Sequence, residues 1–154
     1  MTLSILGPLL EASPEFQQMA KSLRREHADV RAQVISDGTP FLLSTLWRIL
    51  RYPMLIMTPR PEDARRLYDQ ILMWTGDDPN ALHFTESETL PFERLVADMD
   101  STRQRIHVLS ALNSHETDPP LIVASVTAAA QKTIARDVFE NSSHTLTRGQ
   151  TIDP

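Results

Sequence analysis

Five consecutive residues occupy the place where an α/β protein often binds phosphate, between a short apolar run and a helix: Ser36-Asp37-Gly38-Thr39-Pro40. A working phosphate loop needs several glycines, a lysine on the β- and γ-phosphates, and a serine or threonine hydroxyl on magnesium. This segment has one glycine, no lysine and an aspartate that would repel phosphate, and its proline lacks a backbone N–H. We therefore expect neither binding nor hydrolysis of ATP here.

The other residue types that could do chemistry show no convergent spacing. The histidines lack the paired spacing of metal ligands, and we interpret them as surface or helix-end residues. They are His27, His83, His107, His115 and His144. A group of acids could form a metal site or an acid–base pair, but a solvated acidic loop is the favoured interpretation. These acids are Glu86, Glu88, Glu93, Asp98 and Asp100. Ser125 lacks the glycine neighbours of a nucleophile elbow, so we expect no catalytic residue and no metal site.

Arginines are a better functional lead. Five of them lie close together in the sequence: Arg48, Arg51, Arg60, Arg65 and Arg66. Arg60 follows a predicted strand, at the edge where open sheets bind ligands, so Arg60, Arg65 and Arg66 could contact another domain or DNA phosphate. A solvated helix face, with Glu62 and Asp69 as partners, is the favoured alternative. Trp47 and Trp74 lie on predicted helices and are expected in a core or a domain interface.

The elements that would position these residues follow from short apolar runs. Residues 54–57 and 121–126 do not alternate with polar residues, which is typical of strands buried on both faces of a parallel sheet. Residues 32–35 and 81–84 are weaker strand candidates.

Helical patterns lie between the predicted strands. One begins at Pro14 and a second spans residues 41–50. A third begins at Pro61 and is expected to stop at Gly76. Asp100 or Ser101 is expected to cap a further helix that carries Ile106, Leu109 and Leu112 inward, and Thr127 to cap a shorter one. The alternation predicts βαβ units and an α/β fold with a mainly parallel sheet.

Composition limits the function classes. The chain has 154 residues, 41% of them hydrophobic and 23% charged, which suits one globular domain. Its net charge of -5 argues against strong autonomous DNA binding, and the lack of cysteine excludes disulfides, thiolate nucleophiles and cysteine-based zinc sites. The sequence carries neither a long apolar run nor a secretory signal pattern, so we expect a cytoplasmic protein.

Several segments, taken in order, resemble the excision-repair helicase UvrB and, most closely, the bacterial transcription-repair coupling factors. Residues 33–39 (QVISDGT), after the helix that begins at Pro14, look like the opening of UvrB with its phosphate loop eroded. Residues 54–59 (MLIMTP) and 64–69 (ARRLYD) are similar to the second strand and helix of that module, and residues 121–128 (LIVASVTA) to a shared strand and turn.

The segment that most resembles coupling factors is residues 88–95 (ETLPFERL), followed by the helix of residues 100–112. In that family a Trp-Glu-Thr-Leu-Pro-Tyr-Asp type segment precedes an arginine-bearing helix. Here Ser87 replaces the tryptophan and Phe92 the tyrosine. UvrB has an intact phosphate loop and a long aromatic insertion that clamps damaged DNA, whereas this chain has a short acidic loop whose one aromatic is Phe92.

The resemblance implies a three-layer fold like that of P-loop NTPases and UvrB subdomain 1A. Residues 1–13 would be an N-terminal extension, 14–148 the subdomain, and 149–154 the start of a connection. It implies a non-catalytic scaffold in a protein whose partners are UvrA, RNA polymerase and double-stranded DNA. ATP and magnesium would bind only in motor domains outside these residues. Two alternatives stay open, a vestigial nucleotide- or DNA-binding domain and an unrelated small α/β enzyme.

Overall fold

The computed structural model describes residues 3–87, 99–114 and 118–143. The N-terminal elements are η1 (Leu3–Leu6), α1 (Gly7–Glu11), α2 (Pro14–Leu23), η2 (Ser36–Gly38) and α3 (Thr39–Leu50). They are followed by β1 (Met54–Thr58), α4 (Pro61–Thr75), β2 (Ala81–Phe84), α5 (Met99–Asn113), β3 (Leu121–Ser125), α6 (Val126–Ala130) and α7 (Arg136–Ser142).

Local sequence explains where the helices begin and end. Ser13 caps α2 by accepting a hydrogen bond from the backbone N–H of Phe16, and Pro14 takes the first helical position. Pro61 opens α4 in the same way, with two acidic residues in its first turn. Gly76 ends α4 with φ 73°, a left-handed conformation that glycine adopts without strain.

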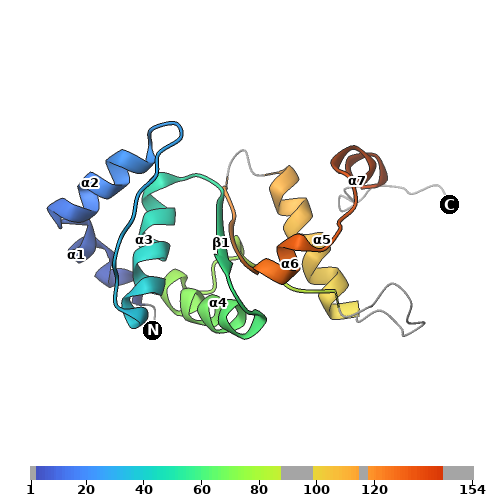
Figure 1. Cartoon of the computed structure of the whole chain (residues 1–154), viewed down its shortest axis with the longest axis horizontal. Helices are drawn as coiled ribbons and strands as arrows, with labels where there is room; N and C mark the ends of the chain where they lie inside the picture. The colour runs from blue at the N-terminus through green and yellow to red at the C-terminus, as the bar shows by residue number, and fades with distance from the viewer. Residues whose placement is uncertain (1–2, 88–98, 115–117, 144–154) are drawn as a thin grey trace, which may run out of the picture.

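The sheet has three parallel strands in the order β1-β3-β2. Thr58 is in register with Ser125, and Phe84 with Ala124, so all three strands end at the same edge. In Figure 1, α3 and α4 lie on one side of β1, and α5 and α6 lie on the other. The fold is therefore α/β, with a small parallel sheet flanked by helices, as predicted from the alternation of elements.

The central strand, β3, lies between two apolar clusters. One face carries Leu121 and Val123 against residues of α3 and α4, including Trp47 and the fully buried Ile71. The opposite face carries Ile122, with residues of β2, α5 and α6, in a second cluster. A third cluster, formed by α2 and the inner face of α3, holds the N-terminal helices on the domain. Burial of each such aliphatic side chain contributes about 1.5–3 kcal/mol.

Burial on both faces is confirmed for β3 but is wrong for β1. Leu55 and Met57 are 58% and 51% exposed, because α5 packs on β2 and does not reach across to the edge strand. The strand candidate at residues 32–35 is also wrong. The carbonyl of Ile35 accepts from the N–H of Gly38, so the chain turns into η2, and no strand partner is found among the described residues.

Two details of the predicted helices are corrected. Ile106 and Leu112 are 51% and 40% exposed, and α5 instead buries Ser101 and Val108. Asp100 and Ser101 lie within the first turn of α5, which begins at Met99.

The predicted cap of the shorter helix is also wrong. Ser125, not Thr127, caps α6 by accepting a hydrogen bond from the N–H of Ala128 at 3.0 Å. The cap lies two residues earlier because β3 passes directly into α6.

Candidate functional site

The carboxyl edge of the sheet brings together polar residues from distant parts of the sequence. In open parallel sheets this edge is the usual ligand-binding position. Glu86 follows β2, Ser125 ends β3 and Thr127 lies in the first turn of α6. The carboxylate of Glu86 accepts hydrogen bonds from the hydroxyls of Ser125 and Thr127, the latter at 2.7 Å. We call these three residues the edge triad.

The edge triad holds its carboxylate in the ionised form. Burial alone would raise the pKa of Glu86, but hydrogen bonds from Ser125 and Thr127 favour the charged form and leave the pKa below its ordinary value. The hydroxyl oxygens of Ser125 and Thr127 are also 2.8 Å apart. The two hydroxyl protons are therefore shared among three short oxygen–oxygen contacts, two to Glu86 and one between the hydroxyls. The result is a fixed negative charge at the edge where an anionic ligand would bind.

A second group of contacts holds the chain around the edge triad. The Gln131 side chain bonds both backbone groups of Ser87, with Oε1 2.7 Å from N and Nε2 3.3 Å from O. Arg105 of α5 donates to the carbonyl of Thr85 at 2.7 Å, and its guanidinium lies 4.1 Å from the centre of the Phe84 ring. Burial lowers the pKa of Arg105. These contacts join the exit of β2 to α5 and to the segment after α6.

The edge triad lacks the geometry of a nucleophilic site. Ser125 is 1% exposed, and its hydroxyl oxygen is occupied both by Glu86 and by the backbone of α6. A serine nucleophile needs access to substrate and a base to take its proton. Ser125 is therefore a helix cap and a hydrogen-bond partner of Glu86 in this structure.

The segment predicted to be an eroded phosphate loop forms η2 and the start of α3. The N–H of Gly38 donates to the carbonyl of Ile35 at 2.9 Å, and the N–H of Thr39 donates to the carbonyl of Ser36. The Thr39 hydroxyl lies 3.5 Å from the same Ile35 carbonyl. Pro40, which has no N–H, is buried at the start of α3. The backbone N–H groups of Gly38 and Thr39 therefore donate to carbonyls at the start of the same turn.

The three candidate arginines lie at or near the start of α4, and each has an acidic partner. Arg60 and Arg66 both bond the carboxylate of Asp63, at 2.9 Å each, and Arg65 bonds Asp69 at 3.2 Å. The expected partner Asp69 is thus confirmed, whereas Asp63 takes the place expected for Glu62. All three arginine side chains are at least 65% exposed, and a shallow depression beside Arg65 and Arg66 reaches the edge triad at Glu86.

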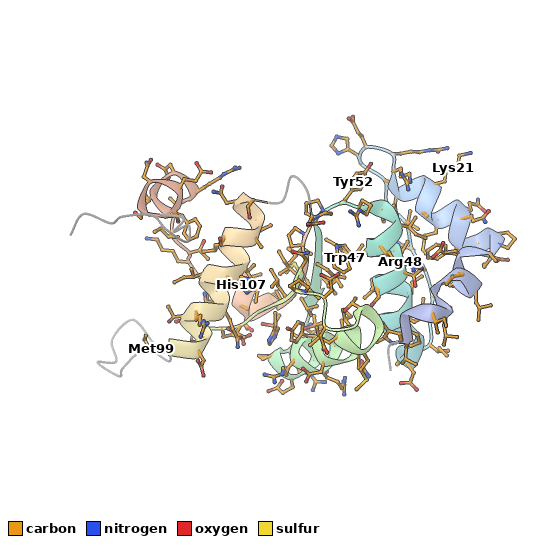
Figure 2. All side chains as sticks on the ribbon, turned by 180° about the vertical axis from the view of Figure 1, so that it is seen from behind. Lys21, Trp47, Arg48, Tyr52, Met99 and His107 are labelled. Carbon is orange, nitrogen blue, oxygen red and sulfur yellow. The ribbon has the colours of Figure 1, made fainter. Side chains whose placement is uncertain are left out.

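The described histidines form no cluster of metal ligands, although His83 and His107 line the same small pocket. His27 follows α2 with φ 56°, and His107 is exposed on α5, where Figure 2 labels it. The ring of His83 stacks on Tyr68 at 5.3 Å, and burial, helped by Arg65, lowers its pKa. No three His, Asp or Glu side chains among the described residues are arranged to hold a metal ion. Five other candidates, His115, His144, Glu88, Glu93 and Asp98, lie outside the described residues.

Both tryptophans border a cavity of about 140 Å³ at the opposite edge of the sheet. Trp47 points from α3 toward the sheet (Figure 2) and donates from Nε1 to the carbonyl of Pro119 at 2.9 Å. Trp74 lies against Phe41, with ring centres 4.5 Å apart. Arg48 pairs with Glu11 of α1. As expected, both tryptophans contribute to packing, Trp47 between α3 and the sheet and Trp74 between α4 and α3.

Sequence reasoning named Glu86, Ser125 and Thr127 separately but did not predict that they contact one another. It did not single out Gln131 or Arg105. The available signal was that Glu86 follows one predicted strand and Ser125 lies at the end of another, and neighbouring parallel strands end at a common edge. No helix of the described ranges is long and apolar enough to span a bilayer. Comparison of the chain with protein-family models, with curated proteins and with solved structures gave no match.

Proposed function

We propose that this chain is a non-catalytic scaffold domain of a transcription-repair coupling factor, the first subdomain of its UvrB-like module. The sequence resemblance motivates the proposal. Four of the segments that carry it fall on successive elements, with residues 33–39 entering α3, 54–59 in β1, 64–69 in α4 and 121–128 across β3 and α6. The segment of residues 88–95 lies outside the described residues. The P-loop NTPase-like and UvrB-like assignment of the fold is part of this proposal.

One observation supports the non-catalytic part of the proposal above all others. Phosphate is bound at a helix N-terminus by backbone N–H groups that point outward and are free. Here the N–H groups of Gly38 and Thr39 both close the η2 turn, and Pro40 has none to offer. Asp37 adds a negative charge to the same turn. The segment would have to refold before it could bind a triphosphate.

The edge triad supports the same conclusion from a second position. A carboxylate that is stabilised in its charged form repels phosphate at the carboxyl edge. The polar side chains of the edge triad are thus engaged with one another, while a shallow depression remains beside Arg65 and Arg66.

In the proposed setting the domain supports a neighbouring UvrA-binding subdomain and helps to mask it in the resting protein. RNA polymerase and double-stranded DNA would be bound by other parts of the parent protein, whose motor domains would use ATP and magnesium. The isolated chain would neither hydrolyse ATP nor bind UvrA tightly. Its place in the cell would be the cytoplasm.

Two measurements test the proposal. Titration calorimetry of the purified chain with Mg-ATP, and separately with duplex DNA, should give no saturable heat at micromolar ligand; saturable heat would support the vestigial binding domain. In cells, the core substitution Ile71→Asp in the full gene should abolish the preference for repair of the transcribed strand, whereas Met73→Asp on the exposed side of the same helix should preserve it. Equal repair of the two strands in the unmodified cell, or an unchanged preference with Ile71→Asp, would reject the coupling-factor assignment.

A further inference from the structure

The outer edge of β1 is open among the described residues, where β3 is its only strand neighbour. The N–H of Met54 donates to the carbonyl of Pro120 at 2.9 Å, so Met54 directs its backbone groups toward β3. Alternate residues of a strand direct these groups to opposite sides. The backbone N–H and C=O of Leu55 and Met57 therefore point to the open edge.

The same two residues also have exposed side chains. Leu55 and Met57 are in register with Ile122 and Ala124. They lie on the face of the sheet that α5 and α6 cover at β2 and β3. That cover ends before β1, which leaves Leu55 58% and Met57 51% exposed. Unpaired backbone groups and uncovered apolar side chains thus coincide on one edge.

This edge has none of the usual protection. Exposed edge strands are normally interrupted by lysine, proline or a bulge, because they otherwise pair with other chains. The strand MLIMT contains no charge and no proline, and its two flanking prolines, Pro53 and Pro59, only mark its ends. A length of 5 residues suits one short added strand.

The charges at the ends of β1 indicate which kind of strand fits. Arg51 precedes the strand and Arg60 follows it. Each pairs with an acid of this chain, Asp118 at 3.9 Å and Asp63 at 2.9 Å, but the arginine side chains are 67% and 73% exposed, and such surface pairs contribute little and can exchange for another acid. In an antiparallel dimer of β1 with a second copy, centred on Ile56, Arg51 of one copy would lie close to Arg60 of the other, which is unfavourable. Acidic residues at the ends of a different strand would be attracted instead. The chain has a net charge of -5, which by itself would repel an acidic segment. This repulsion is weak, because exposed charges more than about 10 Å apart are screened at 0.1 M salt.

We propose that the open edge of β1 binds an extended polypeptide segment as a fourth strand. Apolar side chains at alternate positions of this segment cover Leu55 and Met57, and an acidic residue lies at each end. Backbone hydrogen bonds provide affinity, and the arginines and the exposed apolar face provide selectivity. This proposal does not depend on the proposed function, since it uses only the edge geometry and the charges.

The test uses the synthetic peptide acetyl-Glu-Val-Thr-Val-Thr-Val-Asp-amide and hydrogen exchange of single amides, measured by NMR on the whole chain. With peptide at about ten times its Kd, exchange of the Leu55 and Met57 amides should slow about tenfold. The Met54 and Ile56 amides, which face β3, should not change. Binding with a Kd above about 1 mM does not count as support, so no slowing at Leu55 and Met57 with about 1 mM peptide rejects the proposal.

Three controls separate the causes. A peptide N-methylated at alternate residues should lose the effect, and a peptide with lysine at both ends should bind at least about tenfold more weakly. Leu55→Glu should weaken binding of the acidic peptide, whereas Met73→Glu, an exposed substitution on α4, should not. Equal binding of the lysine-ended peptide would overturn the charge argument. A concentration-dependent dimer with both amides protected in the absence of peptide would assign the edge to a second copy.

Discussion

The indole Nε1 of Trp47 donates to the carbonyl of Pro119 at 2.9 Å, a contact across 72 residues of sequence. It joins α3 to the segment immediately before β3, whose next residue, Pro120, accepts from the first residue of β1. The position of the central strand is thus linked to the first large helix by one side chain.

Trp47→Phe should therefore destabilise the domain. The substitution keeps an aromatic ring in the core but removes the donor, leaving the part-buried Pro119 carbonyl without this hydrogen bond. We expect a loss of about 1–2 kcal/mol in the free energy of unfolding, measured by urea denaturation. Tyr52→Phe, at a residue that is 51% exposed, is the control and should change little. An unaltered Trp47→Phe variant would show that the contact contributes no net stability.

Ile71→Ala should be more damaging. Ile71 is 0% exposed, where α4 packs on β3, and the truncation leaves a cavity that rigid neighbours cannot fill. The expected loss is about 2–5 kcal/mol. Met73→Ala, on the exposed side of the same helix, should cost less than about 0.5 kcal/mol. Similar thermal midpoints for the two variants would contradict the assignment of this face to the core.

Glu86→Gln should make stability depend less on pH in the acid range. The pKa of Glu86 is lower in the folded chain than its ordinary value of 4.5, so the charged form favours folding. That contribution is complete above about pH 4.5 and is lost as the pH falls through the lower, folded pKa. Urea midpoints measured from pH 7 to pH 3 should converge for Glu86→Gln and the unmodified chain. A difference between the two midpoints that stays the same from pH 7 to pH 3 would contradict the lowered pKa of Glu86.

His83→Phe should remove a pH dependence at higher pH. Burial, with Arg65, lowers the pKa of His83 below 6.5, so protonation opposes folding. The stability associated with neutral His83 is complete above about pH 6.5 and is lost as the pH falls through the lower, folded pKa. Phenylalanine keeps a ring against Tyr68 but cannot titrate. The unmodified chain should lose stability relative to His83→Phe on acidification below pH 6.5. A constant difference between the chain and His83→Phe would refute the shift.

How much of the fold the sequence could predict depended on the kind of signal. Pro61 and Gly76 bound α4 as expected, because proline and glycine act through local backbone geometry. Residues 32–35 read as a strand yet pair with none of the described strands, since an apolar run does not reveal whether a neighbour exists. The exposure of Leu55 and Met57 had the same origin, because strand order decides which strand lies at the edge.

The sequence by itself determined that residues 36–40 lack the side chains of a working phosphate loop, and it determined where several helices begin and end. The presence of Asp37 and Pro40 and the absence of lysine from residues 36–40 are read directly from the sequence, and helix ends follow from neighbours only a few positions away. Tertiary structure alone decided that Glu86 meets Ser125 and Thr127 and that β1 keeps an open edge among the described strands. The physical reason is range. Hydrogen bonds and packing act over a few ångströms in space, and only the folded backbone brings residues separated by 39 to 72 positions within that distance.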